Sequence, residues 1–269
     1  MNKNYGEKVA VVTGGSSGIG RELIGGLIKL GYKTVCVSRS EPKTDNGTEC
    51  DFFKCDLSCA EQTKTAAKEI TEKYGRVDLL INNAGLGISG ATELLPEEKI
   101  RYVAEVDYFA PLVFTRELLP AMQRGSKIVM ISSACALFAL PFRGVYCSAK
   151  AALNMLAFGL RMELKNSGIN VVCICPGDIK SEFTANRLKY TDTNERYGLS
   201  VEAAQNKVDG RENKRMNAEK ASKKILKISV KKKGALYIIG AKYKFLYFCS
   251  KIFSQNFMLK MTEKLFLPK

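Results

Sequence analysis

A glycine-rich segment follows directly after a short apolar run near the start of the chain. Residues 8–13 read Lys-Val-Ala-Val-Val-Thr, and Gly14, Gly18 and Gly20 come next, before a helical pattern over 21–30. A glycine cluster between a strand and a helix is typical of a phosphate-binding loop, because the helix N-terminus offers amide donors and a partial positive charge. We expect Gly14 to permit the tight turn, Gly18 to let the backbone approach a pyrophosphate, and Gly20 to allow close helix packing.

The rest of the chain alternates between apolar, strand-like runs and helical patterns. We predict strands at 33–38, 51–56, 77–81, 127–132, 169–175 and 234–240, and helices at 60–74, 97–120, 146–164 and 218–232. Strands that alternate with helices through short connections favour a parallel sheet covered on both faces. With the strand at 8–13, the pattern predicts a Rossmann-type, doubly wound α/β fold of about seven strands, and 269 residues suit one such domain.

Two polar side chains of the helix predicted for 146–164 carry chemistry. Tyr146 and Lys150 lie four residues apart, so both side chains can point into one site. A free phenol titrates near ~10, and a lysine ammonium ~4 Å away can lower that pKa by about two or three units. We therefore expect Tyr146 to act as a general acid/base near neutral pH, tuned by Lys150. Ser133, thirteen residues before the tyrosine, is expected to hold the reacting oxygen, in preference to the adjacent Ser132.

Composition excludes several classes of site. The chain has no histidine, which excludes His-based triads and His-metal sites, and the chemistry above needs no metal. The nine cysteines are odd in number and several stand in apolar runs, which predicts reduced, buried thiols in a cytosolic protein. No apolar stretch is long enough to span a membrane, and the polar residues 1–8 do not predict a secretory signal.

The order and spacing of these groups resemble the classical short-chain dehydrogenase/reductase family. The shared features are the glycine segment 13–20, Asn82-Asn83-Ala84-Gly85, Ser133, Tyr146 with Lys150, and Pro176-Gly177. The resemblance covers residues 8 to about 180 well and the rest loosely. It implies one Rossmann-type domain over 1–269, with hydride transfer between a nicotinamide and a carbinol carbon. It also implies that the polar residues 181–217 form a lid over the substrate, although an ordinary surface excursion stays open.

The end of the second predicted strand bears on the choice between NAD and NADP. NAD enzymes usually place a carboxylate there for the ribose hydroxyls, whereas this chain has Ser38, Arg39 and Ser40. A carboxylate would repel a 2′-phosphate, while a guanidinium and hydroxyls can bind it. These residues predict NADP(H) as the cofactor, and the alternative is that Arg39 is simply exposed.

The resemblance assigns further cofactor contacts. Asp56 is expected to accept a hydrogen bond from the adenine amine. Pro176, Gly177 and Ile179 should line the nicotinamide, and Ser181 should bind its carboxamide. The full predicted set is Gly14, Ser16, Ser17, Gly18, Ile19, Gly20, Ser38, Arg39, Asp56, Leu57, Asn83, Ala84, Gly85, Tyr146, Lys150, Pro176, Gly177, Ile179 and Ser181.

Asp107 departs from the family pattern. It stands where the family commonly carries an asparagine that helps to hold a water in the proton relay to the lysine. An aspartate of similar shape can still present its backbone carbonyl to water. Its negative charge near Lys150 would also weaken the effect of the lysine on Tyr146. Asp107 is therefore either a catalytic member of the site or a residue that only stabilises a bend in the helix.

The net charge of +15 is concentrated in the last third of the chain. Residues 180–269 contain 21 Lys and Arg against 8 Asp and Glu, a net charge of +13. Such a surface attracts an anionic substrate or an anionic membrane face, or is simply solvated. Nucleic acid is disfavoured, because the basic residues are scattered and no nucleic-acid module is recognisable.

The segment 241–269 is both apolar and basic. Its large apolar residues are Phe245, Leu246, Tyr247, Phe248, Ile252, Phe253, Phe257, Met258, Leu259, Leu265, Phe266 and Leu267, interleaved with lysines at 242, 244, 251, 260 and 264. Three interpretations remain open: a pair of helices that walls an apolar substrate cavity, an amphipathic helix lying on lipid, or plain packing against the domain or a partner subunit. The first two both indicate a lipophilic substrate.

Together these features predict an NADP(H)-dependent enzyme that interconverts a secondary alcohol and a ketone, with a steroid or bile acid as the natural candidate substrate. One alternative is a long-chain lipid keto reductase at a membrane surface. Another is a non-catalytic, cofactor-binding sensor, which Asp107 and the segment 241–269 favour and the intact Ser133, Tyr146 and Lys150 disfavour. An epimerase of the extended branch would need a larger substrate domain than 269 residues allow. The expected form is a cytoplasmic homodimer or homotetramer, with peripheral membrane contact through 241–269 as an option.

Overall fold

A single seven-stranded parallel sheet forms the centre of the protein. The computed structural model describes residues 7–42, 50–180, 183, 186–209 and 215–267. The sheet strands are β1 (Val9–Thr13), β2 (Lys33–Ser38), β3 (Asp51–Lys54), β4 (Val77–Asn82), β6 (Met122–Ile131), β7 (Asn170–Pro176) and β11 (Leu236–Ile239). Their order is β11-β7-β6-β4-β1-β2-β3, and every neighbouring pair is parallel. The doubly wound fold predicted from the sequence is confirmed, and the strand order reverses between β1 and β4.

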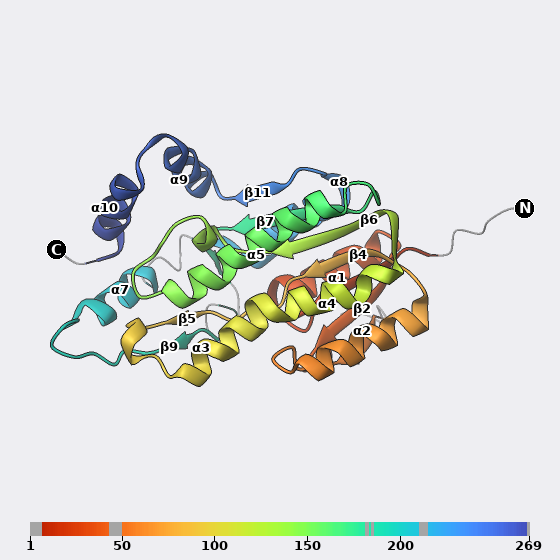
Figure 1. Ribbon diagram of the computed structural model, residues 1–269, viewed down its shortest axis with the longest axis horizontal. Coiled ribbons are helices and arrows are strands. Elements are labelled where there is room, and N and C mark those ends of the chain that lie inside the picture. The colour runs from red at the N-terminus through yellow and green to blue at the C-terminus, as the bar shows by residue number, and fades with distance from the viewer. Residues whose placement is uncertain (1–6, 43–49, 181–182, 184–185, 210–214, 268–269) are drawn as a thin grey trace, which may run out of the picture.

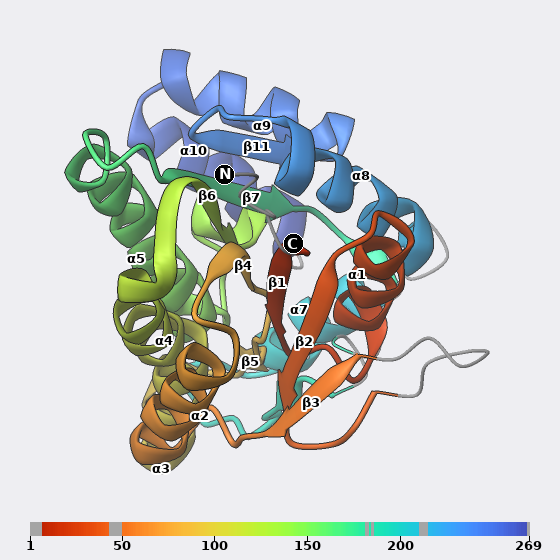
Figure 2. The same ribbon diagram turned by 90° about the vertical axis from the view of Figure 1, so that its right-hand side faces the viewer.

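Helices cover both faces of this sheet. They are α1 (Gly18–Lys29), α2 (Ala60–Tyr74), α3 (Glu97–Ala104), α4 (Ala110–Leu118), α5 (Gly144–Glu163) and α8 (Ala218–Lys231). Figure 2 shows α2, α4 and α5 on one face and α1 and α8 on the other. Each layer has its own apolar core, one including Phe114 and Leu153, the other including Leu23 and Ile225. The inner strands β1, β2, β4 and β7 are almost wholly buried, which explains their continuous apolar character, whereas the edge strands β3 and β11 are only partly buried.

The long helix predicted for 97–120 is interrupted. A π-helical turn, Glu105–Phe109, separates α3 from α4, and Pro111 follows it at the start of α4. Proline has no N–H to donate and disrupts an α-helical ladder, so a local change of hydrogen-bond pattern before it is expected. The turn carries Asp107 into the interior of the protein, where its side chain is fully buried.

Short elements that follow β4 and β7 lie at the carboxyl edge of the sheet. They are β5 (Ile88–Ser89) paired with β9 (Leu188–Lys189), β8 (Ile179–Lys180) paired with β10 (Met216–Asn217), and α7 (Ser200–Asp209). Short 3-10 turns occupy Thr92–Leu94, Leu119–Ala121 and Ala134–Ala136. The two small strand pairs attach parts of the predicted lid segment to the loops that follow β4 and β7.

The segment after β11 forms two helices, α9 (Ala241–Ile252) and α10 (Gln255–Phe266). Figure 1 shows them in blue beyond the end of the sheet, with α10 close to α7. Among the helices that the structure describes, none combines the length and the apolar character that crossing a bilayer requires.

Candidate active site

The carboxyl ends of the central strands open into one cavity of about 350 Å³. Every predicted cofactor residue that the structure describes lines it: Gly14, Ser16, Ser17, Gly18, Ile19, Gly20, Ser38, Arg39, Asp56, Leu57, Asn83, Ala84, Gly85, Tyr146, Lys150, Pro176, Gly177 and Ile179. Ser181 lies outside the described residues. The cavity occupies the crevice where the strand order reverses, which is the usual ligand site of open α/β sheets.

The glycine loop has the shape that a dinucleotide phosphate requires. Gly14 has a φ of +66°, and a Cβ atom there would lie 2.8 Å from the Cα atom of Ala84. A Cβ atom at Gly20 would lie 2.1 Å from the carbonyl oxygen of Gly14. Side chains at either position would displace the backbone that borders the cavity, so these glycines keep the loop close to β4 and α1. The N-terminus of α1, at Gly18, faces the cavity and suits a phosphate.

The ends of β1 and β4 are tied together by Asn83. Its backbone N–H donates to the hydroxyl of Thr13 at 3.0 Å, and its side-chain amide donates to the carbonyl of Gly14 at 3.2 Å. The N–H of Ala84 donates to the same Thr13 hydroxyl at 3.1 Å. These bonds fix the small residues that follow β4 against the glycine loop and keep the space above them open.

At the end of β2, where NAD-binding enzymes usually carry a carboxylate, the described residues are Ser38, Arg39 and Ser40. Ser38 is buried and its hydroxyl donates to the carbonyl of Ser40 at 2.7 Å. Arg39 is exposed and lines the cavity, with Nη1 3.4 Å from the hydroxyl of Tyr102. Partial burial raises the pKa of Asp56, but hydrogen bonds from Ser58 and the positive charge of Arg39 outweigh it and lower that pKa. The described site therefore presents both a cation, Arg39, and a carboxylate, Asp56, at the end of the cavity next to β2.

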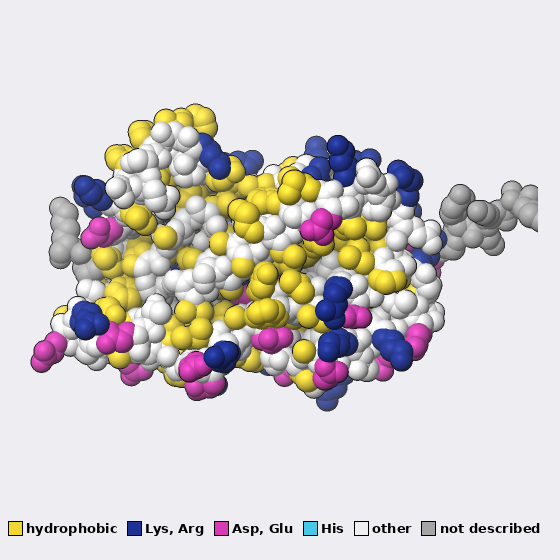
Figure 3. Space-filling view, in the orientation of Figure 1, with side chains coloured by type: hydrophobic (Ala, Val, Ile, Leu, Met, Phe, Trp, Pro, Cys, Tyr) yellow, Lys and Arg dark blue, Asp and Glu magenta, His cyan; other side chains and the backbone are white. Residues whose placement is uncertain are grey.

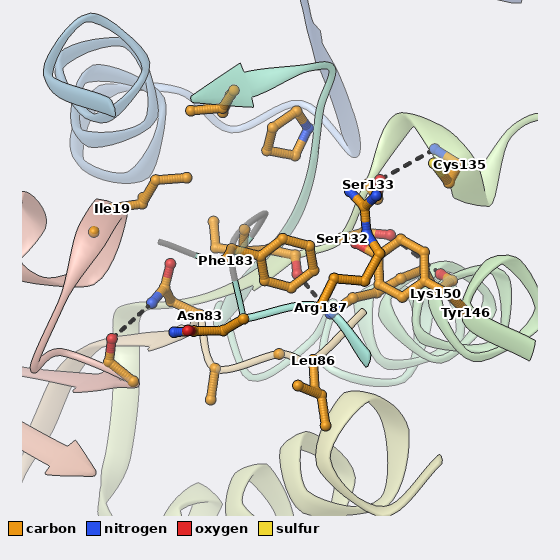
Figure 4. Close-up of a pocket in the computed structure, with 18 of the residues that line it drawn as sticks. Ile19, Asn83, Leu86, Ser132, Ser133, Cys135, Tyr146, Lys150, Phe183 and Arg187 are labelled. Carbon is orange, nitrogen blue, oxygen red and sulfur yellow. Dashed lines mark hydrogen bonds between the residues drawn. The ribbon is translucent and has the colours of Figure 1, made fainter. Parts of the chain in front are cut away.

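Ser133, Tyr146 and Lys150 meet at the other end of the cavity (Figure 4). Tyr146 and Lys150 stand one turn apart in α5 and both are buried. Ser133 follows β6, and its hydroxyl accepts a hydrogen bond from the N–H of Cys135 at 3.1 Å. The neighbouring Ser132 instead donates to the backbone carbonyl of Lys150 at 3.1 Å, which occupies it in holding α5 against β6. Of the two serines, Ser133 is the one that the geometry leaves for a ligand.

Asp107 forms a buried ion pair with Lys150. Its Oδ1 is 3.3 Å from Nζ of Lys150 and accepts a hydrogen bond from the N–H of Leu86 at 2.8 Å. Nζ also lies 3.4 Å from the carbonyl oxygen of Ile131. The second oxygen of Asp107, Oδ2, is buried and has no hydrogen-bond partner among the described residues. A Cβ atom at Gly85 would lie 2.8 Å from Oδ1, so the pair depends on that glycine.

The expectation that Lys150 lowers the pKa of Tyr146 is wrong for the protein in this structure. Burial raises the pKa of the phenol well above its ordinary value, and the negative charge of Asp107 raises it further. A contact with Ser133 acts in the opposite direction without cancelling these effects. The sequence predicted both the ammonium and the opposing charge of Asp107, but it could not give the depth of burial, which is the largest cause of the raised pKa.

The cavity also contains residues that the sequence did not single out. Arg143 precedes α5, and its Nη2 is buried without a hydrogen-bond partner among the described residues. Cys135 also lines the cavity; a hydrogen bond with Cys147 lowers the pKa of its thiol to about 6, and the charge of Arg143 contributes. Tyr243 of α9 packs where a side chain at Gly177 would otherwise stand. The position of Arg143, three residues before Tyr146, could have indicated from the sequence that it lies near the site. Nothing in the sequence around Tyr243 indicates its place in the cavity.

Described residues of the segment 181–217 and of the two C-terminal helices line the same cavity. The ring of Phe183 lies 5.9 Å from that of Tyr146, and Figure 4 shows Phe183 and Arg187 reaching into the space beside the catalytic group. The lining from α9 and α10 consists of Tyr243, Leu246, Thr262, Leu265 and Phe266. The substrate end of the cavity is thus mostly apolar, with arginine side chains among the apolar ones.

Comparison with known proteins agrees with this architecture. The profile of the short chain dehydrogenase family matches residues 8–191. The probable short-chain type dehydrogenase/reductase VdlC of Helicobacter pylori is 33% identical over 240 residues, which are 87% of this chain and 89% of that protein. The 3-ketodihydrosphingosine reductase of Bacteroides thetaiotaomicron is 29% identical over 84% of each chain.

A solved structure extends the likeness to nearly the whole chain. A short-chain dehydrogenase from Streptomyces avermitilis has a TM-score of 0.80 and 28% identity, covering 96% of this chain and 97% of that one. The family profile, these relatives and a cavity that gathers Ser133, Tyr146 and Lys150 beside a glycine loop all agree. This chain belongs to the short-chain dehydrogenase/reductase family, whose members are oxidoreductases that bind a nicotinamide cofactor, NAD or NADP.

Proposed function

We propose that this protein is an NADP(H)-dependent oxidoreductase that interconverts a secondary alcohol and a ketone on a lipophilic substrate, such as a steroid or bile acid. The observation that carries the proposal is the cavity itself. Ser133, Tyr146 and Lys150 stand at one end of it, and apolar side chains of α9 and α10, including Leu246 and Phe266, close it. A small polar substrate would leave this wall in contact with water, whereas a large apolar one covers it.

Each group of the site has a distinct role in the proposed reaction. The nicotinamide, when bound, supplies or accepts a hydride. The phenol of Tyr146 moves the proton to or from the substrate oxygen, and the hydroxyl of Ser133 holds that oxygen by a hydrogen bond. Lys150 places a positive charge beneath the site, and Asp107 partly neutralises it from 3.3 Å. Asp107 thus acts through Lys150 and Tyr146 as a positioning residue, without touching the substrate.

The raised pKa of Tyr146 supports reduction of a ketone at neutral pH. A phenol with a raised pKa is protonated below that pKa, so it can donate a proton to a developing alkoxide. Oxidation of an alcohol needs the phenolate, which forms only as pH rises toward the raised pKa. The proposed enzyme therefore reduces ketones over a broad pH range and oxidises alcohols best at alkaline pH.

NADP(H) is favoured by the end of β2. Arg39 lines the cavity there, between the buried Ser38 and the exposed Ser40. A guanidinium forms strong, charge-assisted hydrogen bonds with a phosphate, while a carboxylate at this point would repel it. The exposed position of Arg39 leaves its side chain free to reach a 2′-phosphate.

Arg143 supports an acidic group on the substrate. Its Nη2 is a buried donor that no described residue satisfies, and it lines the cavity beside the catalytic group. A buried, unsatisfied donor is costly, and a carboxylate or another anion on the ligand would remove that cost. We infer a substrate with an apolar body and an anionic group within reach of Arg143.

A long-chain keto lipid is the second candidate substrate. A relative with 29% identity over 84% of this chain is named 3-ketodihydrosphingosine reductase. An extended acyl chain could lie along the same apolar wall. We further propose that the segment 181–217 acts as a lid, since Phe183 packs 5.9 Å from the ring of Tyr146.

The test is a substrate panel followed by the absorbance of the reduced nicotinamide. The panel pairs NADPH or NADH with a keto steroid, a keto bile acid, a 3-keto sphingoid base and a short ketone. We expect NADPH-dependent reduction of at least one lipophilic ketone, faster than that of the short ketone. Tyr146→Phe serves as the control for the chemistry. Turnover of only small polar ketones would overturn the lipophilic assignment, and NADPH binding without turnover of any ketone would favour the sensor interpretation.

A further inference from the structure

The outer face of α9 and α10 exposes large apolar side chains. Phe245 and Phe248 are 65% and 62% exposed, and Ile252 is 60% exposed. The remaining exposed apolar residues of this surface are Phe253, Phe257 and Leu259. Figure 3 shows hydrophobic side chains gathered over the two helices, with basic side chains beside them. We call these six residues the apolar ridge.

The ridge is continuous across the two helices. Phe245, Phe248 and Ile252 are spaced three and four residues apart, so they share one face of α9. At the junction between the helices, the rings of Phe253 and Phe257 lie 4.7 Å apart. A contiguous exposed apolar surface of this kind marks an interaction site more often than chance exposure does.

The charge around the ridge is almost entirely positive. α9 and α10 carry lysines at 242, 244, 251, 260 and 264 and a single acid, Glu263. Nζ of Lys251 lies 5.0 Å from the centre of the Tyr247 ring, so its stem follows apolar surface while its ammonium stays accessible. Apolar side chains next to lysines are the arrangement of a helix that lies in a membrane interface.

We propose that the α9–α10 ridge docks on the surface of an anionic lipid bilayer, with its aromatic side chains among the acyl chains and its lysines at the headgroups. A second copy of this chain is a poorer occupant. A two-fold contact through this face would bring its lysines against each other, with only Glu263 to offset them. An anionic bilayer offers both an apolar layer and the opposite charge.

Docking of this kind would place the substrate cavity at the bilayer. The inner sides of the same helices contribute Leu246, Leu265 and Phe266 to the cavity wall, while Phe245 and Phe248 face outward. A lipophilic substrate could then enter from the membrane without crossing water. This last step rests on the proposed function, whereas the docking itself does not depend on any substrate.

The experiment is co-sedimentation of the whole protein with vesicles of phosphatidylcholine, alone or mixed with phosphatidylserine. We expect binding to the mixed vesicles only, and loss of binding between ~0.1 M and ~1 M salt as charge is screened. The variant Phe248→Ser with Ile252→Ser should bind at least tenfold less. Lys244→Gln with Lys251→Gln should weaken binding by about fivefold per lysine, the factor that corresponds to about 1 kcal/mol each.

Matched variants separate docking from general effects. Leu30→Ser with Leu199→Ser removes two exposed apolar residues elsewhere, and Lys224→Gln with Lys227→Gln removes the same charge from α8. Both controls should bind as the unmodified protein does. Equal binding by the ridge variant and the unmodified protein would overturn the proposal, and so would equal losses from both lysine pairs.

Two further measurements keep the outcomes distinct. The first is sedimentation velocity without vesicles. If the unmodified protein is a dimer and the ridge variant is a monomer, the ridge is a subunit contact and the lipid proposal fails. Reduction of a water-soluble ketone should be unchanged in the ridge variant, because Phe248 and Ile252 do not line the cavity. Vesicle binding without any ketone reduction would uphold docking while refuting the proposed function.

Discussion

The carboxylate of Asp107 lies 3.3 Å from the ammonium of Lys150, and both side chains are almost completely buried. Lys150 stands one helical turn from Tyr146 in α5, and its charge alone would favour the phenolate. With Asp107 beside it, the positive charge is partly neutralised, and the carboxylate further raises the pKa of the phenol that burial has already raised. The carboxylate of Asp107 therefore changes the electrostatics of both Lys150 and Tyr146.

Replacing Asp107 with asparagine should shift the pH dependence of the reaction. The amide keeps an oxygen that can accept from the N–H of Leu86 but removes the negative charge. The pKa of Tyr146 should fall, so the phenolate forms at lower pH and alcohol oxidation gains rate at neutral pH. The measurement is the pH profile of kcat/KM for oxidation. Glu105→Gln, which removes a carboxylate from the same π-turn, is the control and should leave the profile unchanged.

Replacing Tyr146 with phenylalanine should abolish most turnover. The ring and its packing remain, while the proposed proton donor is removed, and proton transfer by a positioned group contributes about 10²–10⁴-fold. Steady-state kinetics should show that loss in kcat, and fluorescence titration should show nearly unchanged NADPH binding. Tyr243→Phe removes another hydroxyl from the same cavity and should keep most of the activity. Near-normal turnover of Tyr146→Phe would refute the proposed mechanism.

Replacing Arg39 with aspartate should reverse the cofactor preference. NADPH binding should weaken by more than ~1.5–3 kcal/mol, the loss of one charged hydrogen bond, because repulsion of the 2′-phosphate is added. NADH binding should hold or improve. Dissociation constants for both cofactors provide the measurement, and Lys54→Asp, an exposed change of the same charge at the end of β3, serves as the control. Equal losses for both cofactors would mean that Arg39 does not discriminate.

The main architecture could be predicted because it rests on local patterns. Strand-like runs separated by helical patterns predicted all seven sheet strands, and the signal was clearest for the inner strands, which are apolar because both of their faces are covered. The two-residue strands β5, β8, β9 and β10 were not predicted, because two residues carry no detectable period. The π-turn at Glu105–Phe109 was missed for a related reason, since one extra residue per turn hardly alters an apolar pattern.

The site was predictable only where its residues follow strands or share a helix turn. The glycine loop and the Tyr146–Lys150 spacing are local, and the structure places them around one cavity. The packing of Tyr243 against Gly177 joins positions 66 residues apart, and the depth at which Asp107 is buried depends on the π-turn. Neither relationship leaves a signal in the neighbouring sequence, so neither could be anticipated.

The stability of the protein should depend on Asp51 in a defined pH window. Partial burial raises the pKa of this carboxyl, but hydrogen bonds from Tyr74, Lys73 and Lys33 outweigh it and lower the pKa to about 2. A lowered pKa contributes stability above the unfolded value of ~3.9, and this contribution is lost as pH falls toward the folded value. Asp51→Asn should therefore cost about 1 kcal/mol at neutral pH, allowing for solvent screening. Urea denaturation should show the gap between the two proteins narrowing as pH falls below about 4, and a constant gap would contradict this account.

Neighbouring residues of α9 offer a matched test of the cavity wall. Leu246 lines the cavity, whereas Phe245 next to it is 65% exposed. Leu246→Ala removes apolar surface that a bound steroid or acyl chain would cover, which should raise KM for such substrates roughly tenfold. The KM for a short ketone and the affinity for NADPH should not change, because neither needs this part of the wall. Phe245→Ala removes more apolar surface from the same helix and should leave all three constants as they were. If both variants behave alike with a steroid-sized ketone, α9 does not wall the substrate cavity, and the main structural support for a lipophilic substrate is lost.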